Sequence, residues 1–380
     1  MLKTPRFPML RERRVAILAA ALVFTIFFIV HVYFCENRCK YSNSNSLSPD
    51  IQDSKLILAY TNWYREWPLD FSGCEYKCVL TSDKRCLNNA AVVLFLQQGI
   101  RSVTESGQVR DDIPVAASIH QYRALLNFES PGFTLNRMHS ALDGLFNITL
   151  TYRRGSTIQY SIYQGIRREV KNSGQPAINY YAGKTKDMVA YVSNCQSAGY
   201  DRLAAMKDLS AYGLSLDLFG ACGKPANKCH ISAGKLENCE DDVVYKFYLS
   251  YENSLCEDYI TEKFWKVLTS NLYMIPVVMG GKSIDDYTKV APPNSFIHVE
   301  NFTSNLELAQ YLKAVSADAA LFNSYHRWRD MYKYEDQEES LPSCELCRIA
   351  HEKPNLPAVA NLSVWWNENA CRRSETQTYY

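Results

Sequence analysis

The chain has 380 residues, of which 47% are hydrophobic and 21% are charged. At about 150 residues per domain, this length predicts two domains, each able to form a full hydrophobic core. Lys and Arg number 41 and Asp and Glu number 40, so the net charge of +1 argues against a nucleic-acid-binding protein. The aromatic content of 13% also argues against a disordered chain.

The first apolar run of the sequence, Val15–Phe34, contains no Asp, Glu, Lys or Arg. A helix of that length rises about 30 Å, the thickness of the hydrocarbon core of a bilayer. Five basic residues and one acidic residue precede it, so the positive-inside rule places residues 1–14 in the cytoplasm and residues 35–380 in the lumen. A cleaved signal peptide would have a shorter apolar region followed by small residues. We therefore expect residues 15–34 to form an uncleaved transmembrane signal-anchor.

Residues 35–54 are polar and rich in Ser and Asn, which predicts a flexible stem. Two cysteines of this stem, Cys35 and Cys39, are candidates for pairing in a homodimer, because the total of 13 Cys is odd. Beyond the stem, three N-x-S/T sequons are expected to carry glycans in the lumen. Their acceptors are Asn147, Asn301 and Asn361.

Cys344 and Cys347 form a CxxC motif, a spacing that also occurs in redox and zinc sites. A redox motif of the thioredoxin type opens a helix after a strand, whereas this motif follows a turn-like Leu-Pro-Ser. A zinc site would need a second pair, and Cys74 and Cys78 lie far upstream in the sequence. In a luminal compartment we expect structural disulfides, whose connectivity the sequence does not give.

Short apolar runs without alternation predict buried parallel strands in the luminal part. In its first half these strands are Lys55–Tyr60, Ala90–Leu96, Arg123–Phe128 and Ile148–Tyr152. In its second half we predict strands at Met188–Ser193, Leu214–Phe219, Val244–Tyr251, Met274–Met279 and Ser295–Val299, with helices at Asp201–Ala211, Tyr259–Ser270, Leu306–Val315 and Asp318–Tyr332.

This alternation of strands and helices predicts an α/β fold with two doubly wound parallel sheets. The expected units are an N-terminal α/β domain over residues 55–187, a C-terminal α/β domain over residues 188–340 and a Cys-containing tail over residues 341–380. In open α/β sheets, ligands bind outside the carboxyl ends of the strands. Residues that directly follow the predicted strands are therefore the candidates for function.

The segment Tyr245–Lys263 joins an apolar strand, a polar loop and the start of a helix, with Asp258 as the expected N-cap. The N-terminus of a helix at this edge is a binding site for a diphosphate. A Lys in the first turn, such as Lys263, opposes the helix dipole and therefore lowers the stability of the helix unless an anion is bound there. Glu262 can accept hydrogen bonds from ribose hydroxyls. The alternative is an ordinary solvent-exposed start of a helix.

The same segment, YKFYLSYENS followed by DYITEKFW, resembles the α1,3-fucosyltransferases of glycosyltransferase family 10. Further matching motifs are NFESP, FNITLTYR, VAYVSN and DLFG, in the order in which the family has them. The resemblance covers roughly residues 120–345. It implies a Golgi type II membrane protein of the GT-B type, with two Rossmann-like domains, that uses GDP-β-L-fucose as donor.

The resemblance also implies roles for residues at the strand ends. Six residues are expected to bind GDP-fucose or shape its pocket: Arg202, Glu252, Asn253, Tyr259, Glu262 and Lys263. A guanidinium such as that of Arg202 can hold two phosphate oxygens at once. Glu129 is expected to be the general base, and because the transfer inverts the anomeric centre no covalent intermediate is needed. Without the resemblance, Arg202 is also compatible with a surface charge on its predicted helix, and Glu129 with a surface acid at the end of a strand.

The expected acceptor is the 3-hydroxyl of N-acetylglucosamine in a glycan. The Cys-rich segment Cys222–Cys256 slightly favours the N-glycan core over a Lewis-type antenna. No Asp-x-Asp occurs in the luminal sequence, so no metal cofactor is expected to be required, and stimulation by Mn²⁺ stays compatible with the sequence. Two other interpretations remain: a catalytically inactive glycan-binding protein of the same fold, and a luminal thiol oxidoreductase that uses Cys344 and Cys347.

Overall fold

The computed structural model describes residues 39, 53–61, 68–100, 113–114, 118, 120–134, 140–160, 165–169, 178–225, 230–232, 235–237, 244–336 and 340–372. The predicted signal-anchor, Val15–Phe34, lies outside these residues, as does most of the predicted stem. Within the described part of the chain, no helix combines the length and the apolar character needed to cross a bilayer.

The first domain is built on a six-stranded parallel sheet with the order β2-β1-β3-β4-β5-β6. Its strands are β1 (Lys55–Ala59), β2 (Cys78–Thr81), β3 (Val92–Leu96), β4 (Tyr122–Asn127), β5 (Ile148–Thr151) and β6 (Ile158–Gln159). Every residue of β3 and β5 is buried, which explains why these strands are apolar without alternation. Four of these strands were predicted from the sequence, within two residues at each end.

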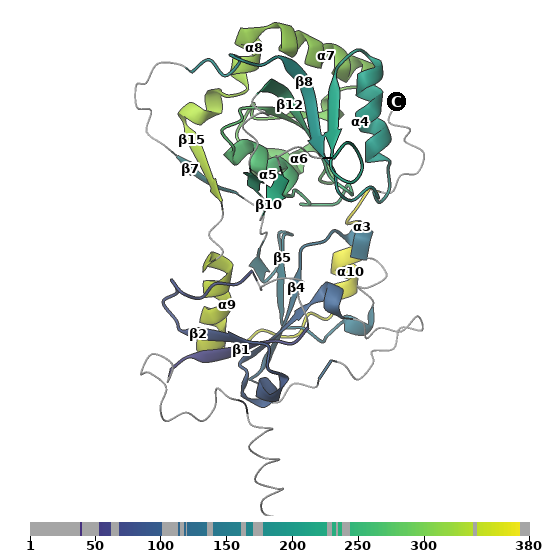
Figure 1. Ribbon diagram of the computed structural model, residues 1–380. Helices are drawn as coiled ribbons and strands as arrows, with labels where there is room; N and C mark the ends of the chain where they lie inside the picture. Colours follow the sequence, from purple (N-terminus) through teal and green to yellow (C-terminus); the bar gives the residue numbers. More distant parts are fainter. Residues whose placement is uncertain are drawn as a thin grey trace, which may run out of the picture.

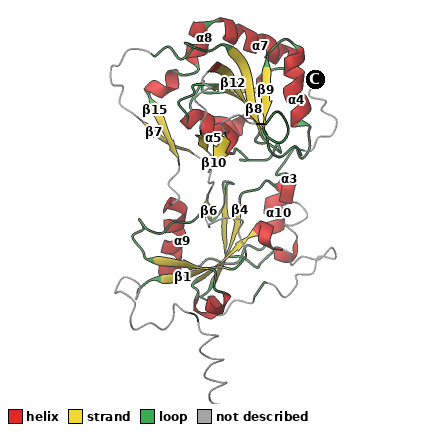
Figure 2. Cartoon of the chain, viewed as in Figure 1, coloured by secondary structure: helices red, strands yellow, loops and turns green. Residues whose placement is uncertain are grey.

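The second domain is built on a five-stranded parallel sheet with the order β14-β13-β12-β8-β9. Its strands are β8 (Lys186–Tyr191), β9 (Leu216–Phe219), β12 (Tyr245–Tyr251), β13 (Ile275–Met279) and β14 (Ile297–His298). Its helices are α4 (Arg202–Ala211), α5 (Glu262–Thr269), α6 (Ile284–Thr288), α7 (Asn305–Ala317) and α8 (Ala319–Ser324). Figure 2 shows helices of this domain on both sides of its sheet. The α/β class and the two Rossmann-like domains are thus confirmed.

Both sheets reverse their strand order next to the first strand of the domain. In the second sheet, β9 lies on one side of β8 and β12 lies on the other, so the reversal falls between β8 and β12. In open α/β sheets, ligands bind in the crevice that such a reversal creates at the carboxyl ends of the strands. The fold therefore places the candidate site where Arg202 follows β8 and Glu252 follows β12.

Further elements complete the described chain. Strands β7 (Gly165–Glu169) and β15 (Tyr332–Asp336) form an antiparallel pair, as do β10 (His230–Ser232) and β11 (Lys235–Glu237). The remaining α-helices are α3 (Pro131–Thr134), α9 (Ser340–Glu352) and α10 (Leu362–Asn367). Short 3₁₀ helices lie at Lys84–Asn89, Gln97–Gly99, Ser140–Leu142, Val299–Asn301 and Arg327–Asp330.

The C-terminal segment, expected to be a tail, is an integral part of the first domain. Helices α9 and α10 lie beside the first sheet in Figure 1. Leu346 and Ile349 of α9 are buried against apolar residues of β3, β4 and β5, and Trp366 of α10 is fully buried beside Phe95 and Phe146. The chain thus leaves the first domain, forms the second and returns to close the core of the first.

Disulfides join distant parts of the chain, as expected for structural bridges, and they correct the expectation for Cys39. Cys74 pairs with Cys344 and Cys78 pairs with Cys347, so the two cysteines of the CxxC bond to different partners and the redox interpretation is wrong. Cys39 pairs with Cys86 of the first domain, so it is not available for a homodimer, and the stem is attached to the domain at this point. Cys35 lies outside the described residues. Among the described residues, further bridges are Cys195–Cys222 and Cys256–Cys371.

The bridges Cys74–Cys344 and Cys78–Cys347 close loops with sequence separations of 270 and 269 residues, so either one constrains the unfolded chain almost as much as both. We expect Cys74→Ser/Cys344→Ser and Cys78→Ser/Cys347→Ser each to change the free energy of unfolding little. Removing all four cysteines should lower it by about 2–5 kcal/mol. Denaturant unfolding measures this non-additivity.

The matched control is the pair Cys195→Ser/Cys222→Ser, whose bridge closes a separate loop in the second domain. Its effect should add to that of either pair without coupling. Strictly additive losses for the two N- to C-terminal bridges would contradict the expectation.

Candidate active site

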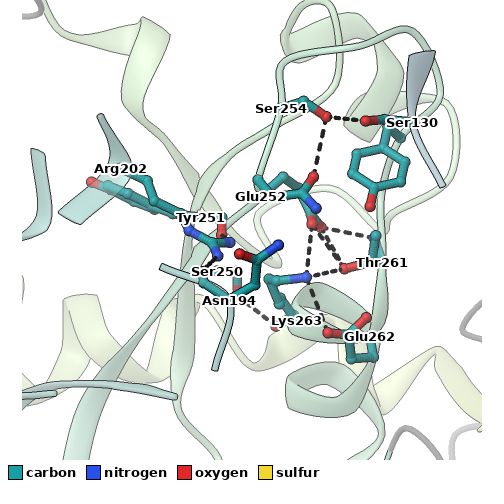
Figure 3. A network of polar contacts seen from close by, with 12 residues as sticks. Ser130, Asn194, Arg202, Ser250, Tyr251, Glu252, Ser254, Thr261, Glu262 and Lys263 are labelled. Atoms are coloured by element: carbon teal, nitrogen blue, oxygen red, sulfur yellow. Dashed lines mark hydrogen bonds and ion pairs between the residues drawn. The ribbon is translucent and has the colours of Figure 1, made fainter. Parts of the chain in front are cut away.

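The candidate site lies where the carboxyl ends of the two sheets meet. In Figure 1, β4 and β5 of the first sheet point toward the second domain. Residues that follow β4 contact residues that follow β12 of the second sheet. The Oγ atoms of Ser130 and Ser254 lie 2.5 Å apart, and this contact is drawn in Figure 3. Gly132 lies so close to the second domain that a Cβ there would be 2.9 Å from the Cβ of Ala198. The two domains are thus in van der Waals contact at this edge.

Glu252 is a fully buried carboxylate directly after β12. Its N–H donates to the carbonyl of Met279 at the end of β13, which fixes its backbone. Its carboxylate accepts hydrogen bonds from the N–H of Thr261 at 2.8 Å and from the hydroxyl of Thr261 at 2.8 Å. Burial raises the pKa of Glu252. A buried carboxylate with this environment depends on a nearby cation.

That cation is Lys263, whose Nζ lies 3.1 Å from Glu252 and 3.0 Å from Glu262 (Figure 3). It also donates to the hydroxyl of Thr261 at 2.8 Å. Burial alone would lower the pKa of Lys263, but the two carboxylates outweigh it and raise the pKa. Burial also opposes ionisation of Glu262, yet Lys263 and Lys266 lower its pKa to about 2. One ammonium is therefore held between two carboxylates.

Helix α5 begins at Glu262 with Thr261 as its N-cap, not near Asp258 as expected. The reason is that Asp258 adopts a left-handed backbone with φ of 60°, and a tight turn follows in which the N–H of Ile260 donates to the carbonyl of Asp258. The chain then runs extended through Thr261 before the helix starts. Helix α5 accordingly presents Glu262 and Lys263 in its first turn, next to Glu252.

Arg202 opens helix α4 and is 1% exposed, so it is not a surface charge. Its guanidinium donates to the carbonyl of Tyr251 at 3.3 Å and to the carbonyl of Asn194. Its Nε has no partner among the described residues. Arg202 thus joins the loop after β8 to Tyr251, the last residue of β12, which directly precedes Glu252. This contact lies at the reversal of strand order.

Asn253 is 8% exposed and its contacts are structural. Its carbonyl accepts from the N–H of Ala198 at 2.7 Å, which holds the loop after β8 against the end of β12. Its side-chain oxygen accepts from the hydroxyl of Ser254 at 3.1 Å. Asn253 therefore shapes the edge of the crevice between β8 and β12.

Glu129 and Tyr259 meet across the domain boundary. Glu129 follows β4, and its N–H donates to the side chain of Asn127 at 3.1 Å in a local turn. The hydroxyl of Tyr259 donates to the carboxylate of Glu129 at 3.4 Å. Burial, and then the charge of Glu129, raise the pKa of Tyr259 well above its usual value, so the phenol stays protonated. The expected base thus faces a residue expected to bind the donor.

Sequence reasoning missed several residues of this site. Thr261 contacts both Glu252 and Lys263, since its N–H donates to Glu252 and its hydroxyl accepts from Lys263. A Thr directly before Glu-Lys is a recognisable N-cap signal. Ser130 and Ser254 carry no signal, because their contact depends on how the two domains are placed. One group of potential metal ligands in the described chain comprises Cys78, Cys347 and His351, but its two sulfurs form a disulfide.

The central ion pair makes a testable prediction. We expect Lys263→Met to lower the free energy of unfolding by about 3–5 kcal/mol, because buried Glu252 would lose its cation. The double variant Lys263→Met/Glu252→Gln should recover most of this loss, since the fully buried charge of Glu252 is then removed, while Glu262 is partly exposed and keeps Lys266 nearby. Urea unfolding measures both values.

Lys207→Met is the control, because Lys207 is an exposed residue of α4 and its loss should change stability by less than about 0.5 kcal/mol. A loss below about 1 kcal/mol for Lys263→Met would show that the pair is not the main support of Glu252.

A crystal structure titled α1,3-fucosyltransferase with GDP-fucose is similar to this chain at 16% identity. The similarity covers 85% of this chain and 96% of that chain, with a TM-score of 0.47.

Two sequence profiles match the chain in succession. The profile of the fucosyltransferase N-terminal part matches residues 52–163, and that of glycosyltransferase family 10 (fucosyltransferase), C-terminal part, matches residues 181–365. The chain is 35% identical over 300 residues to glycoprotein 3-alpha-L-fucosyltransferase A of Drosophila melanogaster, covering 76% of this chain and 54% of that protein. It is 30% identical over 359 residues to alpha-(1,3)-fucosyltransferase C of the same organism, covering 85% of this chain and 80% of that protein. The chain belongs to the fucosyltransferases of glycosyltransferase family 10.

Proposed function

We propose that this protein transfers L-fucose from GDP-β-L-fucose to the 3-hydroxyl of N-acetylglucosamine in a glycan, with inversion of the anomeric centre. The contact between Glu129 and Tyr259 carries the proposal, because it joins the expected base of one domain to the donor motif of the other. Relatives named α-(1,3)- and 3-α-L-fucosyltransferases support the same regiochemistry.

The donor half of the site is assigned to the second domain. A diphosphate at the N-terminus of α5 would be stabilised by the helix dipole and by the ammonium of Lys263. Arg202, buried at the reversal of strand order, supplies a second positive charge at the same edge. As the bond to fucose breaks, negative charge develops on the departing GDP, and fixed cations that are already in place stabilise it without reorganisation. Glu262 is assigned to the ribose hydroxyls.

The acceptor half is assigned to Glu129. Its carboxylate takes the proton of the acceptor hydroxyl while that oxygen attacks the anomeric carbon from the face opposite GDP. The hydroxyl of Tyr259 donates to this carboxylate and so orients it. Since a single displacement inverts the centre, one base suffices. We propose that no metal cofactor is required, because Lys263 and Arg202 provide the charge at the diphosphate, and that any effect of Mn²⁺ is a stimulation.

We propose that the acceptor N-acetylglucosamine belongs to the core of an N-glycan. The other outcome of the test is an N-acetylglucosamine in a Lewis-type antenna. The assay incubates the full-length protein with radiolabelled sugar nucleotides and then with a panel of core and antenna glycans. Fucose should be transferred only from GDP-fucose, and linkage analysis should find it on the 3-hydroxyl. Transfer from another donor would contradict the function, and transfer to antennae alone would contradict the core preference.

We also propose a luminal, membrane-anchored location in the Golgi. The five disulfides of the described chain support an oxidising compartment. Asn301 and Asn361 are exposed, which suits glycosylation. Asn147 is half-buried, and its side-chain nitrogen donates to the carbonyl of Leu356 at 3.0 Å, so a glycan there would have to be attached before this contact forms.

Glycan mapping tests this order. In protein from secretory cells, mass spectrometry should find Asn301 and Asn361 occupied in most molecules and Asn147 occupied in a smaller fraction. Asn301→Gln should keep turnover, because this residue ends a 3₁₀ helix on the surface. Three unmodified sequons would contradict the luminal location.

The base makes the sharpest prediction for the chemistry. We expect Glu129→Gln to lower turnover by about 10²–10⁴-fold while GDP affinity changes little, because the amide keeps the shape but cannot accept the proton. Turnover and GDP titration by calorimetry are measured on one preparation. Glu75→Gln is the control, since Glu75 is an exposed acid of the same domain. A variant that keeps more than about a tenth of wild-type turnover would show that Glu129 is not the base.

A further inference from the structure

The loop between β12 and α5 belongs to the second domain but is held by the first. We call Leu255–Tyr259 the junction loop. Cys256 is bonded to Cys371, and the N–H of Glu257 donates at 2.7 Å to the carbonyl of Ala370, so the returning C-terminus holds one side of the loop. On the other side, Glu257 pairs with Arg153 of the first domain at 2.9 Å. The next two residues of the junction loop, Asp258 and Tyr259, lie nearest the candidate active site.

Asp258 is held by Arg154, which follows β5 in the first domain. The N–H of Arg154 donates to one carboxylate oxygen of Asp258 at 2.9 Å, and its guanidinium pairs with the other. The same guanidinium nitrogen lies 3.0 Å from Asp286 of α6. Asp286 in turn accepts from the N–H of Asp258 at 3.2 Å, so both the side chain and the backbone of Asp258 are fixed.

The burial of these groups shows that this is not an ordinary surface ion pair. The side chains of Asp258 and Asp286 are 7% and 5% exposed, whereas that of Arg154 is 36% exposed. A further cation at this pair, Lys289, is 4.0 Å from Asp286 and 54% exposed. One guanidinium from the first domain thus provides the close charge for two buried carboxylates of the second. Pairs of this kind are costly to break, unlike exposed pairs.

Two consecutive residues of the junction loop are therefore held by two neighbouring strand ends of the first sheet. Arg154, after β5, holds Asp258, and Glu129, after β4, contacts the hydroxyl of Tyr259. Strands β4 and β5 are paired directly, with Asn127 opposite Thr151. Arg154 and Glu129 therefore act on adjacent residues of the junction loop from adjacent strand ends of one sheet.

We propose that Arg154 is a positioning residue for fucosyl transfer: it fixes Asp258 across the domain boundary and thereby holds Tyr259 against Glu129. The inference rests on the proposed function, because it concerns the geometry of the base. The contacts of Arg154 among the described residues include neither Glu252 nor Lys263, so its role is to place Tyr259 beside Glu129 and not to hold the diphosphate. Misplacement of a reacting group by about 1 Å costs up to about 10²-fold in rate.

The test compares variants of the full-length protein in detergent. We expect Arg154→Met to lower kcat by about 10–100-fold, while the KM for GDP-fucose and the Kd for GDP stay within about threefold of wild type. Arg154→Lys keeps the positive charge and the backbone N–H but lacks the planar guanidinium. Its kcat should therefore lie between those of Arg154→Met and the wild type. Lys289→Met removes the other cation near Asp286 and should leave kcat unchanged.

A fourth variant separates positioning from simple neutralisation. Arg154→Met/Asp258→Asn removes one of the two carboxylates that lose their partner, so it restores the charge balance without restoring the hold on the junction loop. Its thermal stability should return toward the wild-type value while its kcat stays low. A stable double variant with low kcat and normal GDP affinity supports the proposal.

Several outcomes would overturn it. These are an Arg154→Met variant with more than a third of wild-type kcat, a double variant with restored kcat, an equal loss in Lys289→Met, or loss of GDP binding together with turnover. Failure of the proposed function is distinguishable, because the wild-type protein would then bind GDP without transferring fucose to any acceptor of the panel.

Discussion

The site depends on one ammonium group that is shared between two carboxylates. Lys263 lies within 3.1 Å of Glu252 and Glu262, and Glu252 is completely buried. Because a buried carboxylate is costly without a cation, this arrangement fixes where α5 starts relative to the end of β12. The same ammonium is the charge that an incoming diphosphate would meet. If Lys263 binds the donor as proposed, stability and donor binding make opposing demands on it, a trade-off that is common at functional sites.

The second constraint is that each half of the site comes from a different domain. The charged cluster is built within the second sheet and is complete without the first. The contact between Glu129 and Tyr259 exists only when the domains are together, and it is supported by the serine pair and by the ion pairs of Arg153 and Arg154. The first domain thus contributes Glu129, the proposed base, and also much of the framework that orients it.

The sequence predicts the strands well because buried parallel strands are uninterrupted apolar runs, and β3 and β12 are buried along their whole length. The donor motif is also recognisable, since its residues are adjacent in the chain. The sequence does not predict features that depend on contacts between distant parts of the chain. The left-handed backbone at Asp258, the partner of Cys39 and the role of α9 are all set by contacts that no local pattern encodes.

The return of the chain to the first domain has a consequence for the order of folding during synthesis. The second domain is formed by residues that follow one another from β8 to α8, so it can fold as soon as it has left the ribosome. The first domain lacks the helices that cover its sheet until residues near Trp366 have been made. Until residues 344 and 347 have been made, Cys74 and Cys78 lack their native disulfide partners and can form incorrect disulfides with other cysteines. The N-terminal half is therefore the part of this protein that matures last and relies most on disulfide exchange.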